Sequence, residues 1–203
     1  MDAVSKVLLL PLRVYLIRHG ETDWSSSERH TSSTDIALSA FGEQQARRLT
    51  GVLGALVFAK VLTSPLKRAR QTCAFAGQGA HAEADADLVE WNYGDYEGRT
   101  TIDIQQQCLD WNVFVDGCPN GESPTQVSAR LDRFIARIAG LKGNVAVFSH
   151  GHLIRALAVR WLQMPVDQAR HLALDTASVS VLARDAGHAN LPIISMWNLP
   201  ANR

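Results

Sequence analysis

The chain has 203 residues, of which 46% are hydrophobic and 20% are charged. These values are typical of a folded globular protein and exclude a long disordered chain, so we expect one domain over residues 1–203. Lysines plus arginines number 20 and acidic residues number 20, which gives a formal net charge of zero. Proteins that wrap nucleic acid or adhere to anionic membranes carry a basic excess, so neither partner is expected. A small local anion site stays compatible with this balance, since 16 of the 20 basic residues are arginines.

The cysteines and the first residues bear on the compartment. Cys73, Cys108 and Cys118 form no CxxC pair, which favours free thiols in a reducing compartment over a disulfide framework or a zinc ribbon. The apolar run at residues 7–10 is broken by Pro11, and it is too short for a secretory signal. No run approaches the length of a membrane span. We therefore expect a cytoplasmic protein without a membrane anchor.

The first half of the chain predicts two strands, each followed by a helix. Residues 14–17 are a β-prone run, and the polar stretch at 22–35 is longer than an ordinary connection. Ser39 is the expected N-cap of a helix that turns four apolar side chains toward the core: Leu49, Val52, Leu53 and Leu56. A second strand at 61–63 precedes a helix that we expect to begin at Pro65 and to reach about residue 76.

The second half continues the alternation. Residues 78–87 predict a loop or an edge strand, and residues 123–126 form a capping box with Pro124 as the first helical residue. The helix behind that box has an apolar face: Val127, Leu131, Phe134, Ile135 and Ile138. A buried strand at 145–148, a helix at 153–162 and strands at 179–182 and 193–197 follow. This order predicts a three-layer α/β/α domain with a central, mostly parallel sheet.

Polar side chains follow the strands of this predicted sheet. The first strand ends in Arg18, His19 and Gly20, the second precedes residues 64–68, and the third precedes residues 149–151. Ligands of open α/β sheets bind beyond the carboxyl ends of the strands. Two histidines and two arginines, His150 and Arg68 among them, are therefore expected at one edge of the sheet.

His19 is the candidate nucleophile of this edge. A neutral imidazole nitrogen attacks phosphorus well, provided that the other ring nitrogen donates a hydrogen bond, which we expect to go to a local backbone carbonyl. Arg18 and Arg68 are candidate phosphate clamps, because guanidinium forks match the oxygens of a transferring phosphoryl group. The alternatives are a core histidine at a strand end and arginines in surface ion pairs.

Two further residues complete the candidate chemistry. His150 is expected to be protonated beside a bound phosphate and to donate to it, with help from Gly151 and the amides of the following helix. His150 and His152 could be read as metal ligands, but no third ligand has a suitable spacing. Glu90, near aromatic residues, is the candidate general acid for the leaving group, unless it is an ordinary solvated glutamate.

Four motifs occur in order: RHGET at residues 18–22, SPLKRARQT at 64–72, Glu90 followed by YGDYEG at 93–98, and SHGH at 149–152. From about residue 14 to residue 160 the chain thus resembles the histidine phosphatase superfamily, phosphoglycerate-mutase-like branch. The resemblance implies His19 as the phosphorylated residue and Glu90 as the proton donor, without metal or cofactor.

The resemblance also implies a set of ligand contacts. Arg18, Arg68 and His150 would form the phosphate pocket, and Ser25 stands where many relatives have asparagine. Thr31, Ser32 and Tyr93 match positions that contact the non-transferred end of the substrate. Gly151 and His152 match backbone contacts beside the second histidine.

The segment after the glutamate motif bears on the reaction. Mutases of this branch carry basic residues there, which hold a second anionic group, whereas residues 100–118 contain no lysine or arginine. The absence of these basic residues, together with the sequences of the segments 22–25, 90–98 and 111–122, looks closest to sedoheptulose-bisphosphatase-like phosphatases. We expect hydrolysis of small phosphorylated metabolites, such as sugar phosphates, with specificity set by residues 26–35 and 100–122. The alternatives are a cofactor-dependent phosphoglycerate mutase and a non-catalytic phosphate-binding regulator; a homodimer stays open.

Overall fold

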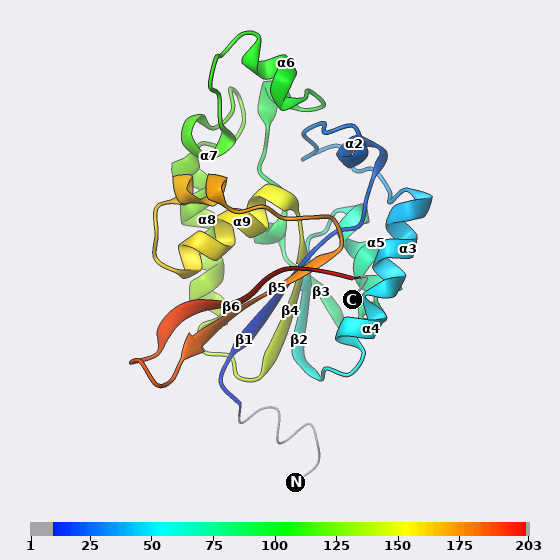
Figure 1. Ribbon diagram of the computed structural model, residues 1–203, viewed down its shortest axis with the longest axis vertical. Coiled ribbons are helices and arrows are strands. Elements are labelled where there is room, and N and C mark those ends of the chain that lie inside the picture. Colours follow the sequence, from blue (N-terminus) through cyan, green and yellow to red (C-terminus); the bar gives the residue numbers. More distant parts are fainter. Residues whose placement is uncertain (1–9, 202–203) are drawn as a thin grey trace.

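A computed structural model describes residues 10–201, so most of the apolar run at 7–10 lies outside the described residues. Six strands form a sheet in the order β3-β2-β4-β1-β5-β6 (Figure 1). Their bounds are Arg13–Arg18, Phe58–Thr63, Ala82–Ala84, Asn144–Ser149, Ser178–Asp185 and Leu191–Pro200 for β1 to β6. Neighbours from β3 to β1 are parallel, whereas β5 and β6 pair antiparallel. The prediction of a mostly parallel sheet is confirmed.

Helices lie on both faces of the sheet (Figure 1). One side has α3 (Ala40–Arg48), α4 (Thr50–Leu53) and α5 (Lys67–Phe75), and the other has α8 (Pro124–Ile138) and α9 (Gly151–Trp161). The short helices are α2 (Asp23–Ser26), α6 (Thr101–Gln105) and α7 (Val113–Asp116), with 3₁₀ turns η1 to η4 at Gly79–His81, Ala86–Leu88, Gly94–Tyr96 and Val166–His171. The chain thus forms the α/β/α layers that the sequence predicts.

The central strand β4 explains the two helix layers. All six of its residues are buried. Because successive side chains of a strand point to opposite faces, Val145 and Val147 belong to the core under α8 and α9, while Ala146 and Phe148 belong to the core under α3 to α5. A strand covered on both faces needs apolar residues on both, and the sequence supplies them at the four inner positions, 145–148.

Local predictions held at two starts and failed at a third. Ser39 caps α3, and Ser123 forms the expected capping box, with Pro124 as the first residue of α8. The prediction that Pro65 begins a helix is wrong, because Leu66 is extended (ψ 141°) and α5 begins at Lys67. The Lys67 N–H donates to a side-chain oxygen of Asp35 at 2.6 Å, and this long-range bond, which no local pattern shows, sets the start of α5.

Residues 78–87 contain the short edge strand β3, which confirms one of the two predicted alternatives. Val179 and Ile193 lie in the two later strands, β5 and β6, as expected. The three cysteines are free thiols. No helix within residues 10–201 is long and apolar enough to cross a membrane.

Three parallel strands end at the same edge of the sheet. Arg18 at the end of β1 pairs with Ser149 at the end of β4, and Thr63 at the end of β2 pairs with Phe148. Backbone bonds continue past these ends, since the His19 N–H donates to the Ser149 carbonyl at 3.0 Å. This register brings the residues after β1, β2 and β4 together.

Candidate active site

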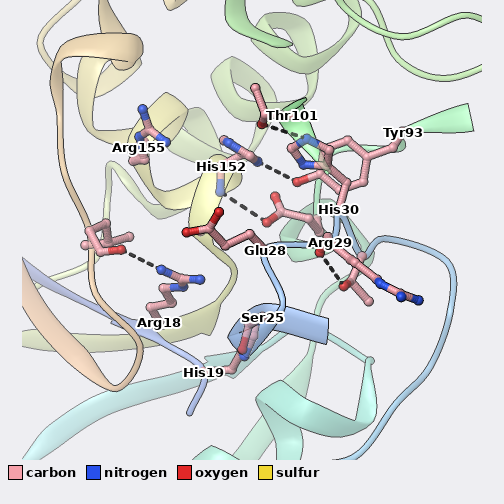
Figure 2. A pocket seen from close by; sticks show the side chains of 14 residues that line it. Arg18, His19, Ser25, Glu28, Arg29, His30, Tyr93, Thr101, His152 and Arg155 are labelled. Carbon is pink, nitrogen blue, oxygen red and sulfur yellow. Dashed lines mark hydrogen bonds between the residues drawn. The ribbon is translucent and has the colours of Figure 1, made fainter. Parts of the chain in front are cut away.

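A pocket of about 470 Å³ opens at this edge of the sheet. Eight of the predicted site residues line it: Arg18, His19, Ser25, Thr31, Glu90, Tyr93, Gly151 and His152 (Figure 2). The other three, Ser32, Arg68 and His150, are buried behind the lining. The structure therefore gathers all eleven residues in one region, in two layers.

His19 lies in the lining with its tautomer fixed. Its Nδ1 lies 2.7 Å from the carbonyl oxygen of Gly20, and because a carbonyl can only accept, Nδ1 carries the proton. This is the local backbone bond that the sequence predicts. Burial, followed by the charges of Arg68 and Arg18, lowers the pKa of His19 well below its usual value. The unprotonated Nε2 thus has the lone pair that attack on phosphorus requires.

Glycine is required directly after His19. The Gly20 N–H donates to Oγ1 of Thr72 at 3.0 Å, which ties the nucleophile loop to α5. A Cβ on Gly20 would lie 2.4 Å from the carbonyl oxygen of Gly42 in α3, which is closer than such atoms ever approach. The close contact between this loop and α3 therefore holds His19 at the end of β1.

Arg18 has an unsatisfied donor beside the nucleophile. Its Nη1 donates to the Leu174 carbonyl at 2.5 Å, while its buried Nε has no hydrogen-bond partner. Burial lowers the pKa of Arg18, but a guanidinium in a protein keeps its charge. An ideal Cβ on Gly151 would lie 3.3 Å from this Nε, so glycine leaves room next to the donor. A buried cation with a free donor is suited to bind an anion.

Arg68 and His150 form a bonded unit behind the lining. Arg68 Nε donates to His150 Nδ1 at 3.1 Å, and His150 Nε2 donates to Oγ of Ser64 at 2.8 Å. The remaining guanidinium nitrogens of Arg68 donate to the carbonyls of Thr31 (3.0 Å) and Thr34 (3.1 Å), so Arg68 holds the 31–34 segment against α5. The ring of His150 lies 5.2 Å from that of His19.

The charge of His150 follows from these bonds. Burial, followed by the charge of Arg68, lowers its pKa well below the usual value, so the neutral form is favoured in this structure. The sequence analysis expected a protonated His150 beside a bound phosphate. A dianionic phosphate nearby would raise the pKa of His150 and so favour its protonated form. This role of His150 stays a prediction.

Glu90 is held by the first amides of α9. Its Oε1 accepts from the backbone N–H groups of Trp91 (2.8 Å) and Leu153 (2.9 Å), and its Oε2 accepts from that of His152 (3.1 Å). Burial raises the pKa of Glu90 and outweighs these amides and Arg68, which lower it. The proton is thus retained to a higher pH than in water, as a general acid needs.

The remaining predicted contacts differ in position. Ser25 and Thr31 line the pocket, whereas Ser32 faces away from it, with its hydroxyl on the Glu97 carboxylate. The Tyr93 hydroxyl lies 2.5 Å from Nδ1 of His152. Sequence reasoning placed the His152 amide beside the second histidine, and the structure engages that amide with Glu90 instead.

Six further residues line the pocket: Glu28, Arg29, His30, Thr101, Arg155 and Leu174. The first four fall within the ranges 26–35 and 100–122 that we expected to set specificity, although none was named singly, whereas sequence reasoning missed Arg155 and Leu174. Arg155 comes four residues after Gly151 on α9, a spacing that puts both on one helix face and could have indicated it. Its guanidinium lies 4.6 Å over the Phe114 ring and donates to the Ala169 carbonyl at 3.2 Å. Burial lowers the pKa of His30 to about 4, so this ring is neutral.

Among residues 10–201 no group of three or more histidine, cysteine or acidic side chains is arranged to hold a metal ion. The described pocket offers a neutral imidazole, a buried guanidinium and a carboxyl group with a raised pKa. These are the groups that phosphoryl transfer through a histidine would require, and they lie beyond the ends of parallel strands, where ligands of such sheets bind.

The chain belongs to the histidine phosphatase superfamily (branch 1), whose family model matches residues 14–198. It is 37% identical over 192 residues to an acid phosphatase of Mycobacterium tuberculosis, covering 93% of this chain and 94% of that protein. It is 36% identical over 192 residues to the sedoheptulose 1,7-bisphosphatase of Saccharomyces cerevisiae, covering 77% and 69% of the two chains. Both likenesses confirm the resemblance that the motifs predict.

Solved structures agree with this assignment. The solved structure of the protein from an open reading frame of Mycobacterium tuberculosis superposes on this chain with a TM-score of 0.87 at 35% identity. The match covers 94% of this chain and 98% of the other. A mycobacterial glucosyl-3-phosphoglycerate phosphatase, solved with VO3, has a TM-score of 0.81 at 28% identity, with 92% and 99% covered. Because several of these relatives are named phosphatases, the predicted class of phosphoric monoester hydrolase is confirmed.

Proposed function

We propose that this protein hydrolyses phosphomonoesters of small metabolites, sugar phosphates above all, through a phosphohistidine on His19. The observation that carries the proposal is the pairing, in one pocket, of a neutral His19 whose Nδ1 is bonded to a carbonyl with a Glu90 whose pKa is raised. A nucleophile without a proton and an acid with one are what the cleavage of a phosphoester needs.

The reaction divides into two transfers. In the first, His19 Nε2 bonds to phosphorus, the bond from phosphorus to the ester oxygen breaks, and the Glu90 proton passes to that oxygen. In the second, water bonds to phosphorus, gives its proton to the Glu90 carboxylate and displaces His19. Arg18 would bind the phosphoryl oxygens throughout, joined by Arg68 and His150 if the phosphate draws them from their present partners.

The substrate class rests on the relatives and on the lining. Two relatives carry sugar phosphates or their derivatives in their names, the sedoheptulose bisphosphatase and the glucosyl-3-phosphoglycerate phosphatase. Ser25 would contact the phosphate, whereas Thr31 and Tyr93, which also line the pocket, would contact the leaving group. The free thiols support the predicted cytoplasmic location. A homodimer and the exclusion of nucleic acid stay predictions from the sequence.

A phosphoglycerate mutase is the second candidate. A probable phosphoglycerate mutase of Shigella boydii is 32% identical over 179 residues, covering 83% of both chains. A mutase must retain a doubly anionic intermediate, and the lack of lysine and arginine at 100–118 argues against that retention. Isomerisation of phosphoglycerate that needs a bisphosphorylated primer and outpaces hydrolysis would establish the mutase.

Turnover of p-nitrophenyl phosphate tests the proposal. His19→Ala is expected to abolish it, while His81→Ala, an exposed histidine on η1, serves as the matched control. A chelator is expected to leave wild-type turnover intact. If chelation stops the reaction and added metal restores it, or if His19→Ala stays active, the proposed mechanism is wrong. A non-catalytic binder would show no turnover at all.

A further inference from the structure

Glu28 is an acidic residue of the pocket that the proposed reaction does not use. It is exposed, follows α2, and has a backbone φ of 57°, in the left-handed region that glutamate rarely adopts. Figure 2 shows its side chain directed into the pocket, between Arg18 and His152. Non-glycine residues with such backbone angles cost free energy and gather at functional sites. Glu28 thus combines a left-handed backbone position with a carboxylate that points into the pocket.

The charges around Glu28 indicate what its carboxylate contributes to the pocket. Three arginines line the pocket, Arg18, Arg29 and Arg155, and they are opposed by two carboxyl groups among the described residues, Glu28 and Glu90. Glu90 is buried against three backbone amides, with a raised pKa. Glu28 thus supplies the negative charge that a ligand meets.

The neighbouring imidazoles add no positive charge. Burial lowers the pKa of His30 to about 4, and burial followed by the charge of Arg155 lowers that of His152 well below its usual value. Without Glu28, the lining would carry the charges of Arg29 and Arg155 with no exposed carboxylate to oppose them. Such a pocket would hold a second phosphate or carboxylate firmly.

We propose that Glu28 determines the specificity of this site for the leaving group. Its carboxylate accepts hydrogen bonds from hydroxyl groups of a polyol and repels a second anionic group on the same molecule. The preferred substrates are then phosphate monoesters of uncharged polyols and sugars, ahead of bisphosphates and phosphorylated hydroxy acids. The same repulsion expels doubly anionic species and so favours hydrolysis over mutase chemistry. This inference rests on the proposed function.

A matched pair of substrates tests the inference. Glycerol 3-phosphate and 3-phosphoglycerate differ by a hydroxymethyl group in place of a carboxylate. We expect wild-type kcat/KM to favour glycerol 3-phosphate and Glu28→Gln to reduce that preference about tenfold, chiefly through faster turnover of 3-phosphoglycerate. In about 1 M salt the Debye length is about 3 Å, so the difference in substrate preference between wild type and Glu28→Gln should shrink, because the mouth of the pocket is open to solvent.

Glu43→Gln is the control for the change in net charge. Glu43 lies on α3, outside the pocket lining, 3.6 Å from Arg47, and its variant should keep the wild-type ratio. Glu28 is exposed, so thermal unfolding should show both variants folded. If Glu28→Gln hydrolyses p-nitrophenyl phosphate but leaves the ratio unchanged, or if Glu43→Gln moves it equally, the inference fails alone. If the wild type hydrolyses none of the three esters, the proposed function fails with it.

Discussion

Replacing Glu90 with glutamine removes the carboxyl proton of this residue and keeps the size and shape of its side chain. Both carboxylate oxygens accept backbone N–H groups, at 2.8, 2.9 and 3.1 Å. Glutamine has one accepting oxygen and a donating NH₂ group, so at least one of the three amides must face a donor. An unpaired buried donor costs about 1–3 kcal/mol. For a chain of this length, each kcal/mol lowers the Tm by roughly 2–4 °C.

The effect of Glu90→Gln on the reaction depends on the leaving group. A positioned general acid contributes about 10²- to 10⁴-fold, and an alkyl phosphate needs all of it because an alkoxide leaves poorly. We therefore expect kcat/KM for glycerol 3-phosphate to fall by roughly that factor. With p-nitrophenyl phosphate the first transfer should be nearly unaffected, whereas the second loses its base, so a burst of p-nitrophenol precedes slow turnover.

Stopped-flow measurement of that burst, beside steady-state rates for both esters, decides the matter. Glu122→Gln is the matched control, because Glu122 holds Arg130 through two bonds (2.9 and 2.7 Å) and lies outside the pocket lining. It should lower the Tm and keep the wild-type ratio of the two substrates. An equal loss on both esters in the first turnover of Glu90→Gln would refute the assignment of Glu90 as the acid.

Three further predictions concern packing and pH. Arg68→Lys disrupts the bonds of the guanidinium to three backbone carbonyls and to a histidine, so we expect a loss of roughly 2–4 kcal/mol in the free energy of unfolding, against under about 0.5 kcal/mol for the exposed Arg70→Lys. Urea titration measures both values, and equal values would contradict the bonding seen here. Gly20→Ala should lower the Tm by several degrees, whereas Gly51→Ala should raise it slightly, because the new Cβ of Gly51→Ala would meet no atom beyond its own helix backbone within 4 Å. The reverse order in thermal scans would be inconsistent with the packing. Because burial raises the pKa of Glu90, its contribution to stability is complete below the usual carboxyl pKa and is lost as the pH rises through the raised value; turnover of glycerol 3-phosphate should fall along the same limb, and a limb that persists in Glu90→Gln would rule out this residue as its origin.

Much of the site could be predicted because its residues follow the ends of parallel strands. The apolar runs locate β1 and β4, and the register between them then fixes where Arg18, His19 and His150 lie. The same logic placed Arg68 near them, although it follows β2 after a short connection. Strand order and motif spacing therefore suffice for the position of the site.

The orientation of the side chains was less accessible. Whether Arg68 faces the ligand or the carbonyls of Thr31 and Thr34 depends on bonds across 37 and 34 residues, which no local pattern encodes. The first amides of α9 donate to the Glu90 carboxylate rather than being left for a phosphate, and this too depends on packing between distant segments. Arg155 lies on α9 beyond the end of the SHGH motif, so none of the four motifs includes it.

The chemical state of His19 during turnover tests the central claim most directly. The protein is mixed with p-nitrophenyl phosphate, quenched in base within the first turnovers, digested and analysed by mass spectrometry. We predict that the peptide containing His19 gains one PO₃ unit that is stable in base, is lost in acid and is absent from His19→Ala. Phosphate on another residue, or full turnover by His19→Ala, would contradict the account.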